Sequence, residues 1–230
     1  MRKTLVAVLA IAGSISTAAF AADREIKIED RLDASADALT DMMQASDKGI
    51  PQDLLDKAHC VVVVPGMKKA GFIFGAEEGR GFAVCRQHGG SGWSAPAAIR
   101  VEGGSVGFQI GVSETDVVLL VMNEGGMKRL LSDKFTLGGD ASAAAGPIGR
   151  DMSAQTDVMM KAEMLSYSRS RGLFAGVSLQ GATLRPDSGT NKELYGHDST
   201  NREILTGDFK TPAVAAKFER ALHRESAQRQ

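Results

Sequence analysis

Closely spaced basic residues are the side chains of this sequence best suited to chemistry, because two cations together can bind an anionic phosphate group. On an extended strand, Arg169 and Arg171 lie two residues apart and therefore on one face, in line with Tyr167. Guanidinium groups match phosphate oxygens with paired hydrogen bonds. The alternative is a solvated strand face whose arginines pair with Asp or Glu.

A second candidate pair, Lys68 and Lys69, follows the turn-forming dipeptide Pro65-Gly66 and precedes the apolar run Phe72–Phe74. Charge beside hydrophobic residues is the composition expected of a loop that touches a membrane surface. Lysines in loops also commonly have no specific partner, so the alternative is an ordinary solvated turn.

Two further pairs are less specific. Lys128 and Arg129 lie on a short predicted helix, where a basic pair either binds an anion or forms the wet face of the helix. Asp140 and Arg150 bracket a stretch of small residues, which favours a buried ion pair that joins the ends of the stretch. Removing one partner of such a pair would mainly damage folding.

The two cysteines, Cys60 and Cys85, each fall in a predicted strand and could form a disulfide in an oxidising compartment. Two buried thiols are the alternative, since the segment GFIFG between them could separate the two strands beyond bonding distance. The neighbouring His59 and His88 do not favour zinc, because adjacent residues on a strand point to opposite faces and no paired ligand spacing occurs. We therefore predict no metal site.

Catalytic signatures are missing from the sequence. It contains no G-x-S-x-G elbow, H-E-x-x-H, Walker phosphate loop or dinucleotide-binding fingerprint, and its four histidines are scattered. We therefore predict a protein that is not an enzyme and needs no cofactor. Trp93, which precedes Pro96, is predicted to fill space in a core poor in aromatic residues, with a place at a membrane interface as the alternative.

The N-terminus has the pattern of a secretory signal. Arg2 and Lys3 precede an apolar run from Leu5 to Ile15, and small residues follow up to Ala21 and Ala22, where cleavage is predicted. Removing residues 1–21 leaves 25 basic and 28 acidic residues, a formal charge of −3. That balance argues against nucleic-acid binding. The signal pattern predicts an exported, periplasmic protein that is soluble or attached only peripherally to a membrane.

Hydrophobic periodicity places helices at both ends of a strand-rich region. Apolar residues at helical spacing predict an amphipathic helix from Ile28 to Met43, a short helix after Pro51, and a C-terminal helix from Pro212 to about Arg224. The runs between them predict an α+β fold with a curved, mainly antiparallel sheet, and leave open whether the sheet closes into a barrel-like form.

Glycine punctuates the predicted strands. Three copies of one pattern occur, GFIFG at 71–75, GFQIG at 107–111 and GLFAG at 172–176, and they predict sharply curved strands or close backbone approach. Hairpin turns are predicted at Pro65-Gly66, at Glu77–Gly79 and at Glu102–Gly104.

Several segments follow one another in a recognisable order: VVVVP, KKAGFIFGAEEGRG, WSAP, SVGFQIGVSETDVVLLVMN, LGGDASAAAGPIGR, YSRSRGLFAGVSLQGATLRPD and YG. Together they closely resemble the SYLF domain, a lipid-binding family, from about Ile50 to Gly196. With the signal and the terminal helices, the likeness predicts four segments: 1–21 for the signal, 22–50 for the N-terminal helix, 51–200 for the SYLF-like domain and 201–230 for a linker and helix.

The resemblance implies binding of phospholipids, and in some eukaryotic members of actin. For an exported chain we expect non-enzymatic binding of anionic phospholipid headgroups, with Arg169, Arg171, Lys68, Lys69, Lys128 and Arg129 as candidate ligands. Scaffolding of a protein partner in the cell envelope is the alternative function.

Overall fold

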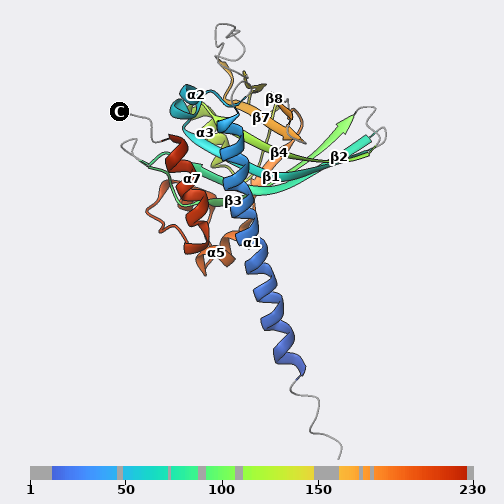
Figure 1. Ribbon diagram of the computed structural model, residues 1–230, viewed down its shortest axis with the longest axis vertical. Coiled ribbons are helices and arrows are strands. Elements are labelled where there is room, and N and C mark those ends of the chain that lie inside the picture. Colours follow the sequence, from blue (N-terminus) through green and yellow to red (C-terminus); the bar gives the residue numbers. More distant parts are fainter. Residues whose placement is uncertain are drawn as a thin grey trace, which may run out of the picture.

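A nine-stranded sheet forms the centre of the structure, a computed structural model, with helices on both sides (Figure 1). The structure describes residues 12–45, 49–71, 74–87, 92–106, 111–147, 161–170, 173–176 and 179–226. The strands are β1 Cys60–Gly71, β2 Phe74–Cys85, β3 Ala97–Val106, β4 Gly111–Val121, β5 Phe135–Thr136, β6 Ala143–Ala145, β7 Met164–Ser170, β8 Leu173–Gly176 and β9 Thr183–Pro186.

The strand order is β5-β9-β3-β2-β1-β4-β7-β6, with β8 paired to β7 outside this path. Every recorded pairing between strands is antiparallel except that of β6 with β7. No pairing among the described residues joins β5 to β6, so the curved sheet stays open. The predicted α+β class with a curved, mainly antiparallel sheet is confirmed.

Helices from both ends of the chain pack on the sheet. They are α1 Ala12–Gln44, α2 Gln52–Lys57, α3 Glu124–Leu130, α5 Ser188–Tyr195, α6 Asn201–Thr206, the short 3₁₀ turn η2 Ala213–Ala215 and α7 Ala216–Ser226. The predicted first helix is longer than its amphipathic pattern, and its N-terminal turns extend beyond the sheet (Figure 1). Among the described residues, no helix combines the length and the apolar character that crossing a membrane would require.

Two hydrophobic cores lie on opposite faces of the sheet. One contains Val61, Val63 and Phe82 packed against α1, α2 and α7. The other contains Val62, Leu119 and their neighbours packed against α3 and α6. Because both faces are covered, the central strands are apolar at every position, which is why Cys60–Val64 and Val117–Val121 read as unbroken hydrophobic runs.

The three predicted hairpin turns inside these strands are wrong. Pro65-Gly66 lies within β1, where the register shifts between Val64 and Met67 and forms a bulge instead of a turn. Glu77–Gly79 is the middle of β2, and Glu102–Gly104 is part of β3. Glycine lets two strand backbones approach each other closely at Gly81, where a Cβ would lie 1.9 Å from the carbonyl oxygen of Val63.

The glycine motifs lie at the end of the sheet where consecutive strands connect. Gly71, the last residue of β1, pairs with Gly75 on β2 and with Gly111 on β4, so three glycines lie side by side in register. The third motif similarly links β7 to β8, where Ser170 pairs with Leu173. Residues 72–73, 107–110 and 171–172 of the motifs lie outside the described residues.

Candidate functional site

Arg169 holds together three elements of the fold. From β7 its Nε and Nη2 donate to Oδ2 of Asp116 on β4, at 3.1 and 2.7 Å, and its Nη1 donates to Asp41 on α1. Burial opposes the charge of Arg169, but the hydrogen bonds to the two carboxylates outweigh it and raise the pKa of the guanidinium. Only 24% of the side chain is exposed. The alternative of an arginine paired with acidic residues therefore describes Arg169, while Arg171 lies outside the described residues.

Lys68 and Lys69 lie in the C-terminal part of β1, and their predicted placement in a turn is wrong. Lys69 Nζ is 3.0 Å from Oε1 of Glu77, its partner on β2. Lys68 is exposed and lies in register between Glu78 on β2 and Glu114 on β4. Lys68 therefore has an acidic partner on each side and Lys69 has one, which weakens the case that they attract an anionic headgroup.

Lys128 and Arg129 keep their cationic groups available. Both are exposed in the last turn of α3. Arg202 joins them from α6, because its Nη2 donates to the carbonyl oxygen of Leu131 at 3.2 Å, directly after α3. Ser132 Oγ contacts the carbonyl oxygens of Arg129 and Lys134, at 2.6 and 3.3 Å, which folds the exposed Lys134 back to the same end of the helix.

These four residues, Lys128, Arg129, Lys134 and Arg202, are called the α3 basic group. None of them forms an ion pair within the described part of the chain. One acidic residue, Asp133, lies between Arg129 and Lys134 in the sequence. Sequence reasoning found only the first two members. Arg202 is more than seventy residues away in sequence and is brought here by the packing of α6 against the same face of the sheet as α3.

A second set of cations was missed altogether. Arg80 on β2 pairs in register with Arg100 on β3, and Arg100 pairs with Arg185 on β9. The three guanidinium groups form one row across neighbouring strands, called the arginine row, on the face of the sheet that packs against α1. Alternation along each strand could have placed each arginine on a face, but no sequence pattern reveals the register that aligns them.

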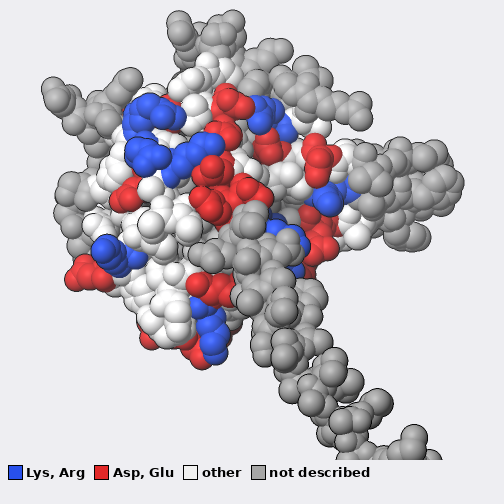
Figure 2. Space-filling model, turned by 60° about the horizontal axis from the view of Figure 1, so that its bottom comes forward, with Lys and Arg blue, Asp and Glu red and all other residues white. Residues whose placement is uncertain are grey.

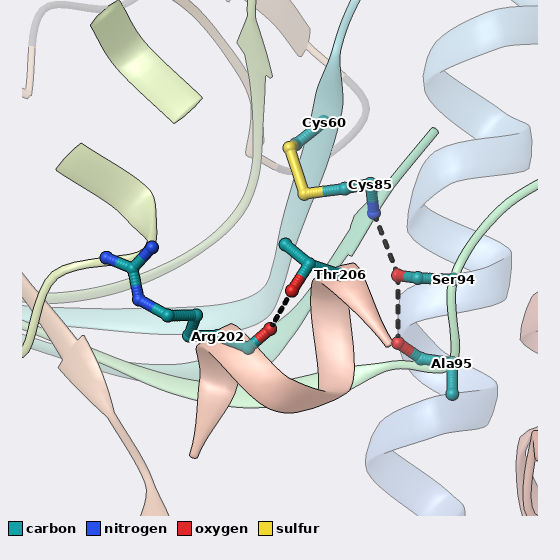
Figure 3. The surroundings of a disulfide bond; sticks show 6 residues. All are labelled: Cys60, Cys85, Ser94, Ala95, Arg202 and Thr206. Carbon is teal, nitrogen blue, oxygen red and sulfur yellow. Dashed lines mark hydrogen bonds between the residues drawn. A yellow bond between two sulfur atoms is a disulfide. The ribbon is translucent and has the colours of Figure 1, made fainter. Parts of the chain in front are cut away.

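Of the two alternatives for the cysteines, a disulfide or two thiols, the antiparallel pairing of β1 with β2 gives the disulfide. The segment GFIFG does not form a strand between the cysteines; it includes the connection from β1 to β2, so Cys60 and Cys85 are direct partners in register and are joined by a disulfide (Figure 3). The bond lies on the face that packs against α6, and both cysteines are completely buried.

The predicted partner of Arg150 is not buried. Asp140 is exposed, and its Oδ2 accepts a hydrogen bond from the backbone N–H of Thr136 at 2.8 Å, which stabilises the turn after β5. Because this carboxylate has a local role at the surface, the expectation of a buried pair is wrong for Asp140. Arg150 lies outside the described residues.

Trp93 is part of the core, as predicted, and its alternative place at a membrane interface is wrong. The side chain is 5% exposed, its Nε1 donates to Ser226 Oγ at 3.0 Å, and the guanidinium of Arg86 lies 3.9 Å from the ring centroid. The indole thereby attaches α7 to the loop after β2.

We expect the fluorescence of Trp93, the only tryptophan, to stay unchanged when vesicles are added, because the indole is already buried. Emission spectra of the protein with and without anionic vesicles measure this. A blue shift on binding would contradict the buried position. Urea unfolding should shift the emission to the red and provides the positive control.

Neither metal nor nucleophile chemistry has an evident place in the described residues. No three His, Cys, Asp or Glu side chains come together there in a way that could hold a metal ion. Ser199 Oγ lies 2.9 Å from Nδ1 of His197, but the two residues are neighbours in a turn and the imidazole packs on Phe209. The geometry is that of a local turn.

Charges of both signs alternate on the surface. Figure 2 shows basic and acidic side chains interspersed on the visible face, with no broad area of one sign. A stripe of aspartates on α1 accounts for part of this pattern, since Lys217 of α7 contacts Asp33 and Asp37, at 3.6 and 2.9 Å. On the face that Figure 2 shows, an anion would have to be recognised by a local group of cations.

Comparison with known protein sequences shows which proteins this chain is similar to. Residues 102–225 match the Ysc84 family, described as Las17-binding protein actin regulator. The chain is 37% identical over 174 residues to the SH3 domain-containing YSC84-like protein 1 of Xenopus laevis, covering 75% of this chain and 51% of that protein. It is 34% identical over 180 residues to LAS seventeen-binding protein 3 of Saccharomyces cerevisiae, covering 77% and 39%.

The chain thus spans about half of the first of these relatives and less of the other. An SH3 domain-containing protein of Schizosaccharomyces pombe is 39% identical over 177 residues, and the matched region is 41% of its length. The shared part in each case is a region of roughly the size of the domain described above.

Proposed function

Because the chain belongs to the Ysc84 family, the SYLF family of the sequence analysis, we propose that it is a non-enzymatic binding protein whose ligands are anionic phospholipid headgroups at a membrane surface. We further propose that residues 1–21 direct its export and that it works in the periplasm. Arg2, Lys3 and the apolar run from Leu5 to Ile15 support the export signal.

The α3 basic group is the observation that carries the proposal. Its four cationic side chains are exposed, close to one helix end, and free of ion pairs among the described residues. Arg169 and Lys69, in contrast, already contact carboxylates. A cation that must first leave a carboxylate gains little from a phosphate, whereas an exposed and unpaired one gains the full attraction of the surface.

Electrostatics sets the expected size of the effect. Each Lys or Arg near an anionic membrane surface contributes about 1 kcal/mol. Removing two members of the α3 basic group should therefore cost about 2 kcal/mol, or roughly 30-fold in affinity. Binding of this kind weakens as salt rises, because the charges are exposed and screened.

We expect the double variant Lys128→Ala, Arg129→Ala to lose most of its binding to anionic vesicles while remaining folded. Flotation of the protein with vesicles of neutral and of anionic lipid, across a salt series, measures this. The matched control is Lys57→Ala, Lys192→Ala, which also removes two exposed positive charges but from α2 and α5.

Equal loss in the control would show that net charge matters and the α3 basic group does not. Absence of flotation by the folded wild-type protein at low salt would refute the lipid proposal. That second result would favour the alternative function, assembly with a protein partner.

The alternative rests on the names of the relatives. One is named a LAS seventeen-binding protein, and the family description also refers to protein binding. If this chain also binds a protein, the interaction should be indifferent to lipid charge and should yield a complex of defined stoichiometry.

A further inference from the structure

The arginine row places like charges opposite one another across three strands. Arg100 is the direct register partner of Arg80 on one side and of Arg185 on the other. Cross-strand partners of this kind have Cβ atoms about 4.5–5.5 Å apart. Like charges at this separation destabilise a sheet. Counter-charges near the row must therefore offset the repulsion.

The carboxylates around the row do so only in part. Arg185 pairs with Glu102, and Asp187, which is 4% exposed, stands between the other two arginines. Its Oδ2 is 3.4 Å from Nη1 of Arg80, and its Oδ1 is 3.9 Å from Nε of Arg100, too far for a hydrogen bond. Asp187 also caps α5 by accepting from the backbone N–H of Thr190 at 3.4 Å.

A fourth arginine approaches from the helix above the sheet. Arg31 on α1 lies close enough to the row that its pKa is lowered, first by burial and then by the charge of Arg80, with Asp187 and Glu193 acting in the opposite direction. Its Nη1 and the Nε of Arg100 are buried and have no hydrogen-bond partner among the described residues. Buried guanidinium nitrogens without partners are uncommon, because leaving a donor unsatisfied is costly.

We propose that Arg31, Arg80 and Arg100 bind a small oxyanion of the phosphate class beside Asp187. Nη1 of Arg31 and Nε of Arg100 are buried donors without a partner among the described residues, and an oxyanion held between these arginines would accept from both. The side chains of Arg80 and Arg100 remain 44% and 32% exposed, which leaves the row open to a ligand from solvent.

A tetrahedral phosphate suits this arrangement. Guanidinium groups bind phosphate oxygens through charge-assisted, paired hydrogen bonds, and the donors here come from a helix and two strands. The N-terminal end of α5 begins at Ser188, directly after Asp187, and adds a positive helix end to the same region. Either free phosphate or the phosphomonoester of a lipid headgroup presents this chemistry.

This site is separate from the α3 basic group and does not depend on the proposed function. The arginine row lies on the face of the sheet that packs against α1, whereas α3 packs against the opposite face. Lipid binding through α3 can fail while the arginine site stands, and the reverse also holds.

The test is a titration with inorganic phosphate in place of chloride at constant ionic strength, with the melting temperature as readout and calorimetry for stoichiometry. We expect a saturable rise of about 5–10 °C at a hundredfold excess over the dissociation constant, with one phosphate bound per chain. A rise that never saturates, or no rise, would overturn the proposal.

The variant Arg100→Gln should lose this rise while its melting temperature in chloride stays within about 2 °C of the wild type, because it removes both a weak contact to Asp187 and the repulsion from its neighbours. Arg220→Gln, a change on the exposed face of α7, is the control and should keep the full rise. If Arg100→Gln does not fold, Arg80→Gln replaces it, since that side chain is more exposed. An undiminished rise in the folded variant would refute the site.

A second arm identifies the source of the phosphate. Short-chain phosphatidic acid below its micelle concentration is compared with inorganic phosphate by calorimetry. Tighter binding of the lipid supports the site and assigns it to a headgroup, and equal binding supports it as a site for free phosphate. Failure of both ligands to bind would overturn it.

Discussion

Replacing Cys60 and Cys85 together by alanine is expected to lower the free energy of unfolding by about 3 kcal/mol. The disulfide closes a loop over a sequence separation of 25 residues and so restricts the unfolded chain. The expected loss corresponds to a fall of about 6–12 °C in melting temperature for a chain of this size.

Thermal unfolding with and without reductant measures this effect and supplies its own control. Reductant should lower the melting temperature of the wild-type protein and leave that of the Cys60→Ala, Cys85→Ala variant unchanged. If the wild-type value does not respond after complete reduction, verified by thiol titration, the disulfide contributes nothing to stability and the prediction is wrong.

Replacing Arg169 by alanine is expected to cost about 3 kcal/mol of stability. The change would leave the carboxylates of Asp116 and Asp41 facing each other without their shared cation, and Asp116 is only 20% exposed. Losing one partner of a largely buried ion pair typically costs about 3–5 kcal/mol, and the partial exposure of this group favours the lower end.

The matched control for Arg169→Ala is Arg185→Ala. Arg185 and Glu102 form an ion pair whose side chains are 42% and 40% exposed, and its loss should cost less than about 1 kcal/mol. Urea unfolding followed by Trp93 fluorescence compares the two variants. Stability of Arg169→Ala equal to the wild type, combined with lost flotation on anionic vesicles, would contradict the structural role and return Arg169 to the headgroup site.

The stabilities of these variants also bear on the lipid experiment. A double change at Arg169 and Arg171 would lower vesicle binding through partial unfolding, whether or not either arginine touches a headgroup. Lys128 and Arg129 are therefore the better place to test lipid binding, because both side chains are exposed and form no ion pair among the described residues.

Local patterns in the sequence determined the elements and the family. The spacing from Ile28 to Met43 predicted the amphipathic part of α1, and Pro212 and the apolar positions after it predicted α7. The unbroken apolar run Val117–Val121 is typical of a strand buried on both faces, and the two cores bury it from both sides. These features depend on residues close together in the chain, so periodicity is enough to reveal them.

Strand register was decided only by the tertiary structure. The dipeptide Pro65-Gly66 predicts a turn. In the structure β1 pairs with β4 on one side and β2 on the other, and Pro65-Gly66 forms a bulge within it. That single correction lengthens β1 and moves Lys68 and Lys69 from a loop to a strand with glutamate neighbours. It also extends the pairing of β1 with β2 as far as Gly71 and Gly75, and makes Cys60 and Cys85 direct partners.

The functional groups depend on the same register. Arg80, Arg100 and Arg185 are unremarkable in sequence and become neighbours because β2, β3 and β9 align them. Arg202 reaches Lys128 and Arg129 because α6 and α3 share one face of the sheet. The sequence alone determined which residue types and elements exist, whereas contacts across strands and faces depend on register and packing, which join residues far apart in the chain and have no local signature.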